Sequence, residues 1–273
     1  MACDSHTGEL FVFPHSGRFQ GRDTYSEPVL IGDRFHWQRD YGVVRTIDIN
    51  GNGHADVIAL CDRDVNGRSG VFLFPNRGRL DGLDTLAGPI QISGPRSDRR
   101  WETLGIADLD LDGCDDMFGR EKDRGEVHGF FNRREVVEHE TYSREPVLMV
   151  TVDVADWPLG MADFTGSGRP DLLVRRGNGD LDVYEFAPDE TGGGVRFGDG
   201  GRWFTVARGW QSYDRIVLTD VDLDGHPDLL AIGADGVLLA FQHDGVFDPE
   251  NPLALFRAPV VVATGWQRFG MIS

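Results

Sequence analysis

The chain has 273 residues, of which 40% are hydrophobic, and it carries a formal net charge of −18. A chain of this length can bury a substantial core, whereas this charge argues against nucleic acid as a partner because phosphates would be repelled. No apolar run approaches the roughly 20 residues that a membrane helix needs, so we expect no membrane partner. Only three cysteines are present, too few for a disulfide framework.

The strands expected from the sequence follow one order along the chain. Residues 8–14 and 28–32 predict two strands, and residues 42–47 predict a third that leads into an acidic loop at 48–56. Each acidic loop is followed by a short apolar strand, a polar turn, a second strand, a longer loop and a third strand. Downstream of the first acidic loop, the predicted strands are residues 57–60, 70–74, 89–92, 117–118, 126–131, 146–150, 172–174, 180–184, 203–206, 229–232, 236–241 and 259–262.

The loop that starts at Asp220 is the clearest of four acidic copies. Carboxylates stand at its positions 1, 3, 5 and 9, and Gly225 stands at position 6. Alternate side chains of a tight loop converge on one side, and such oxygen ligands suit Ca²⁺. An EF-hand loop has Glu at position 12, but here Ala231 lies there within an apolar run, so the loop leads into a strand.

The four copies predict up to four structural Ca²⁺ ions. Recurrence once per repeat favours a structural over a catalytic role. The Asp163 copy has Thr165 and Ser167 in place of acids and is expected to bind most weakly. The predicted metal ligands are Asp48, Asn50, Asn52, Asp56, Asp108, Asp110, Asp112, Asp116, Asp163, Thr165, Ser167, Asp171, Asp220, Asp222, Asp224 and Asp228.

The repeats predict an all-β fold built as a single five-bladed β-propeller over residues 1–273. Four short strands recur about every 55–60 residues, and such units bury their faces by radial stacking. The chain begins within a second strand and ends with a first strand at 266–272. We therefore expect four-stranded antiparallel blades and a ring closed by pairing of the C-terminal strand with the N-terminal blade.

These loops resemble the FG-GAP (VCBS) repeat family. The matching residues are the Asp-rich loops followed by Asp-Leu-Leu, and the Gly-Trp-Gln-x-[Tyr/Phe] stretches at 209–213 and 265–269. The resemblance implies Ca²⁺ between the first and second strands of a blade. Similar proteins include integrin-like propellers, sugar-binding propellers and propellers attached to enzymes, so the resemblance implies more about architecture than about function.

Tryptophans near the start of each repeat are the predicted ligand contacts. A Trp at a fixed phase is explained either by packing between blades or by a ring platform for a sugar. The candidate ligand residues are Trp37, Gln38, Trp101, Trp157, Trp210, Gln211, Tyr213, Trp266 and Gln267. The leading hypothesis is a lectin-like propeller that binds a carbohydrate or another small molecule.

The alternative is a small-molecule enzyme, a lyase or cyclase, with one acid/base site in the axial funnel. Its candidate residues are His36, Asp40, Arg45, Glu102, Asp214 and Arg215. A protein-interaction scaffold is a third possibility. His128 lies in the middle of a predicted strand and is expected to be a core residue or a satisfied polar neighbour.

The N-terminal residues lack the basic and apolar regions of a signal peptide. The sequence as written therefore predicts a cytoplasmic protein, and a secreted protein whose leader was removed is the alternative.

Overall fold

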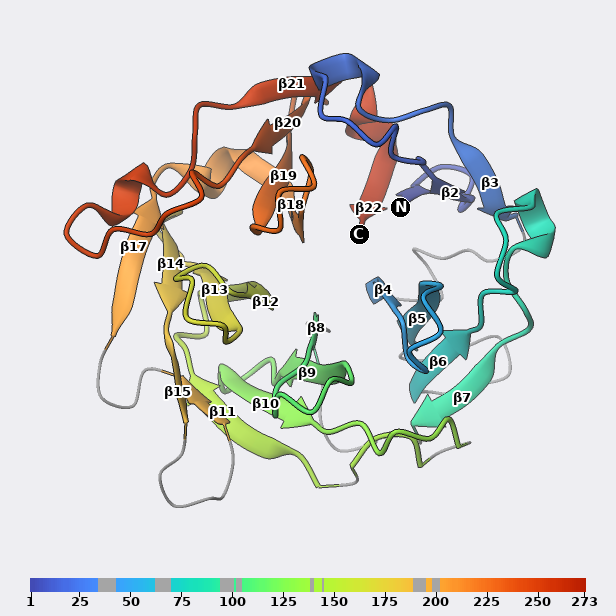
Figure 1. Cartoon of the computed structure of the whole chain (residues 1–273), viewed down its shortest axis with the longest axis horizontal. Helices are drawn as coiled ribbons and strands as arrows, with labels where there is room; N and C mark the ends of the chain where they lie inside the picture. The colour runs from blue at the N-terminus through green and yellow to red at the C-terminus, as the bar shows by residue number, and fades with distance from the viewer. Residues whose placement is uncertain are drawn as a thin grey trace.

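The computed structural model describes residues 1–33, 43–61, 70–93, 101, 105–137, 140–143, 145–188, 195–197 and 202–273. These residues form five four-stranded antiparallel sheets arranged as blades around an axis (Figure 1). The predicted all-β, five-bladed propeller is confirmed. Within the described part of the chain, no helix is long and apolar enough to cross a membrane.

Each blade runs from an innermost strand near the axis to an outermost strand at the rim, and its strands follow in that order. Blade 1 comprises β22 (Phe269–Ile272), β1 (Ala2–Asp4), β2 (Leu10–Val12) and β3 (Val29–Gly32). Blade 2 comprises β4 (Val43–Ile47), β5 (Asp56–Cys61), β6 (Gly70–Phe74) and β7 (Ile90–Ser93). Blade 3 comprises β8 (Gly105–Ala107), β9 (Asp116–Arg120), β10 (Glu126–Phe130) and β11 (Val147–Thr151).

Blade 4 comprises β12 (Trp157–Ala162), β13 (Asp171–Arg175), β14 (Leu181–Tyr184) and β17 (Trp203–Ala207). Blade 5 comprises β18 (Tyr213–Thr219), β19 (Asp228–Gly233), β20 (Leu238–Phe241) and β21 (Val260–Ala263). An additional hairpin, β15 (Phe186–Pro188) and β16 (Val195–Phe197), follows β14 and contacts β11 of blade 3. The sequence did not predict this hairpin.

The ring closes through the two ends of the chain. β22 pairs antiparallel with β1, and Ala2 lies opposite Ile272. Beyond the strands, the Met1 amine donates to the Ser273 carbonyl at 2.6 Å, and the Ser273 N–H donates back to the Met1 carbonyl at 3.0 Å. The predicted closure by the C-terminal strand is confirmed, and it covers the strand edges that blade 1 would otherwise expose.

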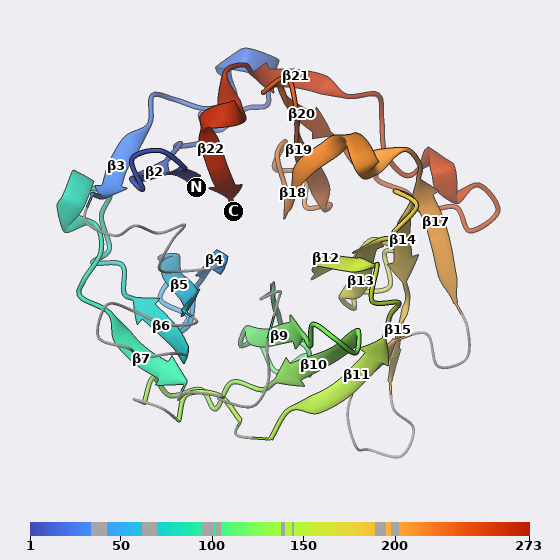
Figure 2. The ribbon, with the colours of Figure 1, turned by 180° about the vertical axis from the view of Figure 1, so that it is seen from behind.

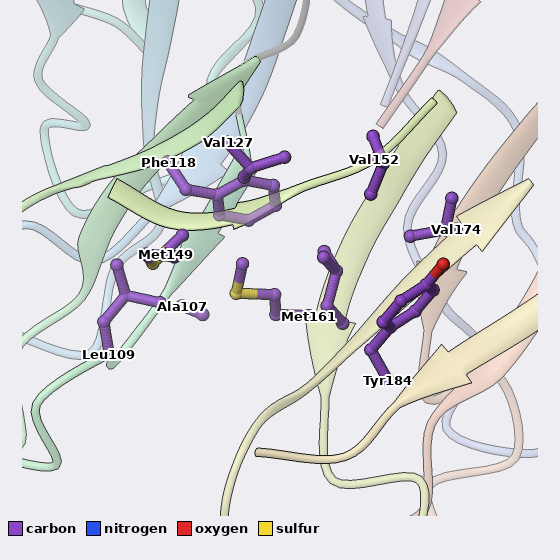
Figure 3. Close-up of a cluster of buried hydrophobic side chains, with 10 residues drawn as sticks. Ala107, Leu109, Phe118, Val127, Met149, Val152, Met161, Val174 and Tyr184 are labelled. Carbon is purple, nitrogen blue, oxygen red and sulfur yellow. The ribbon is translucent and has the colours of Figure 1, made fainter. Parts of the chain in front are cut away.

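In the part of the chain that the structure describes, the core consists of five hydrophobic clusters, each lying between two neighbouring blades. Successive side chains of a strand point to opposite faces, so each sheet supplies residues to two clusters. Figure 3 shows the cluster between blades 3 and 4, which includes Phe118, Val127, Met149, Met161, Val174 and Tyr184. The interfaces between blades therefore supply the apolar burial that stabilises the ring.

Short 3₁₀ turns in the loops between third and fourth strands make further contacts around the rim. The turns η1 (Gly21–Asp23), η2 (Gly82–Asp84) and η4 (Pro252–Ala254) contact β21, β3 and β17, respectively. Each of these strands is the outermost strand of the preceding blade, so the turns join neighbouring blades at their outer edges.

Candidate functional site

The four acidic loops connect the first and second strands of blades 2 to 5, on one face of the ring that we call the loop face. In the Asp220 loop, the N–H groups of Asp224 and Gly225 donate to the two Asp220 oxygens at 3.0 and 2.9 Å. The equivalent two bonds recur at Asp48, Asp108 and Asp163. Each first aspartate therefore folds its own loop around its carboxylate.

The ninth residue of each loop is a buried aspartate that joins two loops of the same blade. Asp228 is fully buried, and its oxygens accept the N–H groups of Val221 at 2.9 Å and His243 at 2.6 Å. Asp116 accepts the N–H groups of Leu109 and Asn132 in the same way. These bonds position one carboxylate beneath each loop.

Two of the loops bring three carboxylates close together. One oxygen each from Asp108, Asp110 and Asp116 lie within 4.8 Å of one another, and the same holds for Asp220, Asp222 and Asp228. Burial, and then the like charges of neighbouring loop aspartates, raise the pKa of Asp116 to about 7 and that of Asp228 to about 6. A bound cation would remove that repulsion, and several convergent carboxylate oxygens fit Ca²⁺.

The other two loops offer fewer charges. In the Asp163 loop, both the N–H and the hydroxyl of Thr165 donate to Asp171 at 2.9 Å, so hydrogen bonds already occupy that carboxylate. In the Asp48 loop, Asn50 and Asn52 point their side-chain oxygens at backbone N–H groups within the loop, at 3.1 and 2.8 Å.

The opposite face, at the beginnings of the first strands, carries the four predicted tryptophans that the structure describes, and we call it the tryptophan face. Two of them, Trp210 and Trp266, begin the 3₁₀ turns η3 (Trp210–Ser212) and η5 (Trp266–Arg268), which lie ahead of β18 and β22 (Figure 2). Their N–H groups donate to Gly179 and Gly236 of the preceding blades at 2.8 and 2.9 Å.

The glutamines that follow these tryptophans pack on the same two glycines. A Cβ on Gly179 would lie 2.0 Å from the side-chain oxygen of Gln211, and one on Gly236 would lie 1.9 Å from that of Gln267. The Gly-Trp-Gln stretch thus docks one blade on a tight turn of its neighbour.

The rings of these two tryptophans pack against aromatic neighbours. Trp210 is 4% exposed and lies 4.5 Å from Phe241 and 5.0 Å from Tyr213, measured between ring centroids. Trp266 is partly exposed, and its ring lies 4.7 Å from that of Phe13.

Trp101 and Trp157 occupy a different position. Trp101 bridges to Glu121 as Tyr213 of β18 pairs with Gly233, so Trp101 aligns with the aromatic residue three positions after Trp210. Trp157 is the first residue of β12 and pairs with Arg175, so it takes the register position of Arg215 in β18. The expectation of one fixed phase is therefore wrong for the described tryptophans, because neither Trp101 nor Trp157 aligns with Trp210.

Among the described tryptophans of the tryptophan face, Trp157 is the most exposed. Its exposed fraction is 37%, and the guanidinium of Arg120 lies 5.1 Å from its ring centroid. Arg120 is itself buried and donates to the carbonyl groups of Val154 and Asp156. This anchors the cation beside the indole at the boundary of blades 3 and 4.

The structure describes three of the six proposed catalytic residues. Arg45 lies on β4, where burial lowers its pKa to about 10, and Arg215 lies on β18, where its Nε donates to the Gly270 carbonyl at 3.0 Å. Asp214 is exposed, and among the described residues no ion pair joins it to either arginine. His36, Asp40 and Glu102, like the ligand candidates Trp37 and Gln38, lie outside the described residues.

The sequence did not predict a second cluster of metal-ligating side chains on the tryptophan face. One ligand atom each from Glu121, Glu126 and His128 lie within 4.8 Å of one another. The three residues are close because the turn between β9 and β10 folds back. The spacing of these three residues along the sequence matches no known metal motif. Only the pairing of β9 with β10 shows that they are close.

A comparison with protein families agrees with the repeat pattern. Residues 163–231 match the FG-GAP-like repeat, which confirms the resemblance over the Asp163 and Asp220 loops. No curated protein sequence matches the chain. Among solved structures, a lectin of Agrocybe aegerita, described for its specific recognition of non-reducing terminal N-acetylglucosamine, is 18% identical with a TM-score of 0.48. The match covers 97% of this chain and 66% of the lectin chain, so the chain spans less than two thirds of that lectin.

Proposed function

We propose that this chain is a calcium-stabilised binding propeller whose ligand is a carbohydrate. The observation that carries the proposal is Trp157, a 37% exposed indole on a rigid inner strand, with the guanidinium of Arg120 beside its ring. An indole face stacks on the apolar face of a sugar ring, while nearby polar groups bond its hydroxyls.

Several candidate ligand residues have separate roles in this proposal. Trp101, Trp157 and Trp266 would contact the ligand, because their rings are at least partly exposed. Trp210, Gln211 and Gln267 would not contact the ligand. They would instead fix the positions of the ligand residues, because they pack or hydrogen-bond against a glycine of the preceding blade.

Calcium has a structural role in this proposal and does not contact the ligand. In blade 4, Trp157 begins β12, whereas the Asp163 loop follows the other end of that strand at Ala162. The tryptophan face and the acidic loops thus lie at opposite ends of the inner strands. Ions bound to the loops would fix the turns between first and second strands and so keep the blades in register.

The proposal is tested on a glycan array with Trp157→Ala and with Trp203→Ala as the matched control. Trp203 is 52% exposed but lies on the outermost strand β17, away from the tryptophan face. We expect Trp157→Ala to weaken glycan binding by about tenfold or more, given the value of a stacked aromatic contact. The control should bind as the parent chain does.

Absence of any bound glycan, or equal binding by both variants, would contradict the carbohydrate proposal. A small-molecule enzyme is then the second candidate. One observation favours it: His128 Nε2 lies 3.7 Å from Glu126 Oε2 on the tryptophan face, where an acid/base pair could act.

A further inference from the structure

We propose that Glu121, Glu126 and His128 bind a divalent transition-metal ion such as Zn²⁺ on the tryptophan face. This site is distinct from the acidic loops. Glu121 follows the end of β9, whereas the loop aspartate Asp116 begins the same strand. The inference does not depend on the carbohydrate proposal.

The geometry suits a small ion with mixed nitrogen and oxygen ligands. One ligand atom from each residue lies within 4.8 Å of the others, and the His128 Nε2 to Glu126 Oε2 distance is 3.7 Å. Ligands about 2.1 Å from Zn²⁺ lie at most about 4.2 Å apart, so a small rotation of the glutamates completes the contact. Imidazole together with carboxylate favours Zn²⁺ and similar ions over Ca²⁺.

A buried oxygen of Glu121 supplies an independent observation. Its Oε2 is inaccessible to solvent and has no hydrogen-bond partner in the described part of the chain. A buried carboxylate oxygen without a partner is costly, and a metal ion is one of the few groups that can satisfy it. Trp101, which bridges to Glu121, packs its ring 5.5 Å from His128 and forms a wall of the site.

The internal repeat shows that the fold does not require a polar residue at the position of His128. Strand register places Phe11, Phe72 and Leu239 of blades 1, 2 and 5 at the position of His128. His128 is only 5% exposed, yet it replaces apolar residues in a packed layer.

Blade 4 shows how such a polar substitution is satisfied. Its equivalent residue is Asp182, which is buried and pairs with Arg176 at 3.7 Å. Arg176 occupies the position of Glu121, and its Nε also lies 3.2 Å from the buried Asp156. A protein cation thus balances buried acids in blade 4. In blade 3 the position of Arg176 carries an acid, Glu121. A metal ion would supply there the positive charge that Arg176 supplies in blade 4.

Among the described residues, the arginine that pairs with Glu126 does not replace that ion. Arg124 reaches Glu126 only at 4.0 Å, and its side chain is 64% exposed. Such a long, solvated ion pair contributes little to the stabilisation of the Glu126 carboxylate. Three protein ligands would also leave a coordination position open to water or to an oxygen of a bound ligand.

The test titrates the metal-stripped protein with ZnCl₂ and CoCl₂ while excess CaCl₂ keeps the acidic loops occupied. We expect one equivalent to bind by calorimetry, and the visible absorption of Co²⁺ to report a nitrogen ligand. His128→Phe should weaken binding by about tenfold or more, and it is compatible with the fold because Phe11 and Phe72 occupy the equivalent positions. His6→Ala is the matched control, because His6 is an exposed imidazole in the β1–β2 turn of the same face.

Glu126→Gln is the second variant, which keeps the shape of the side chain and removes its charge. It should also weaken binding about tenfold or more, whether or not His128→Phe folds. Absence of a saturable Zn²⁺ site in calcium-saturated protein, or unchanged affinity in either folded variant, would overturn the proposal.

Discussion

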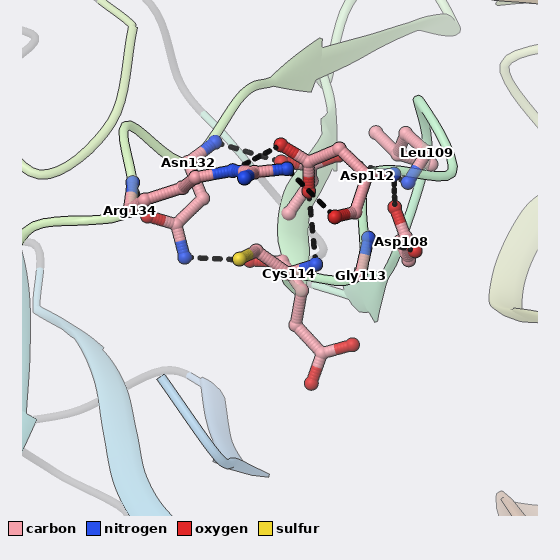
Figure 4. A network of polar contacts seen from close by, with 9 residues as sticks. Asp108, Leu109, Asp112, Gly113, Cys114, Asn132 and Arg134 are labelled. Carbon is pink, nitrogen blue, oxygen red and sulfur yellow. Dashed lines mark hydrogen bonds and ion pairs between the residues drawn. The ribbon is translucent and has the colours of Figure 1, made fainter. Parts of the chain in front are cut away.

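Arg134 holds Asp112, a predicted calcium ligand, through two contacts: its Nε lies 2.9 Å from Asp112 Oδ2, and its Nη2 donates to the Asp112 carbonyl at 2.7 Å (Figure 4). Arg134 has a φ of 64°. The matching positions in blades 1, 2 and 5 are glycines with φ of 85°, 82° and 83°, namely Gly17, Gly78 and Gly245. Blade 3 therefore has an arginine in a left-handed backbone conformation at a position where blades 1, 2 and 5 have glycine. The contact of this arginine with Asp112 accompanies the strained conformation.

The first prediction is that Arg134→Gly strengthens calcium binding by the Asp108 loop. The guanidinium lowers the pKa of Asp112 through its hydrogen bond and places a positive charge beside the predicted ion. Removing it should raise the affinity by on the order of threefold to tenfold at low salt, and less at high salt. Calcium calorimetry measures the change.

Arg79→Ala is the matched control for this prediction. Arg79 makes a similar exposed pair with Asp81 at 2.9 Å, but Asp81 is not a predicted ligand. Equal shifts for both variants would show that only the general charge of the surface matters.

The second prediction is that calcium binding releases protons and strengthens as the pH rises. The pKa of Asp116 is raised to about 7 and that of Asp228 to about 6, chiefly by burial, so both carboxyls are partly protonated near pH 6 without metal. Ca²⁺ needs the ionised form, so its apparent affinity should rise between about pH 5 and pH 7.5. Calorimetry in buffers of different ionisation enthalpy counts the protons released.

The same pKa shifts fix the direction of the stability change in calcium-free protein. A carboxyl whose pKa is higher in the folded chain favours folding when protonated, and that contribution is lost as the pH rises through the folded value. Calcium-free protein should therefore become less stable from about pH 4 to pH 7, and saturating Ca²⁺ should reverse this loss. An identical pH profile with and without Ca²⁺ would contradict the assignment of these carboxyls as ligands.

The third prediction ranks the loops. Asp108→Asn and Asp220→Asn should each remove one of the two tightest calcium-binding events, because these loops bring three carboxylates together. Asp163→Asn should leave both events in place, because the Asp163 loop lacks acids at two ligand positions and Thr165 already bonds Asp171. Loss of the tightest event in Asp163→Asn would reverse the ranking.

The sequence predicts the blades well because their determinants are local. Acidic loops, alternating apolar strands and glycine turns recur at one spacing, and the two ends of the chain reveal the strand that closes the ring. The role of Gln211 is not readable from the sequence, because its partner Gly179 lies in another blade. The sequence also misplaces Trp157, because only strand register distinguishes its position from that of Trp210.

The same limit applies to the cluster of Glu121, Glu126 and His128. Its members look like unrelated surface and core residues until β9 and β10 are paired, and their departure from the repeat shows only when blades are compared position by position. Motif reading detects ligands that are close along one loop. It misses ligands that a turn and a strand register bring together.

The last prediction concerns the contact between blades made by Gln211. Gly179 has a φ of 87°, and a Cβ there would lie 2.0 Å from the Gln211 side-chain oxygen and 2.9 Å from its backbone nitrogen. Gly179→Ala should therefore lower the free energy of unfolding by about 3 kcal/mol or more, since it adds a clash to the cost of a left-handed alanine. Gly209→Ala is the matched control, because Gly209 has a φ of 81° but no atom within 4 Å of an added Cβ, so it should lose only about 1–2 kcal/mol. Urea unfolding measures both variants, and equal losses would show that the contact with Gln211 adds nothing to the interface between blades 4 and 5.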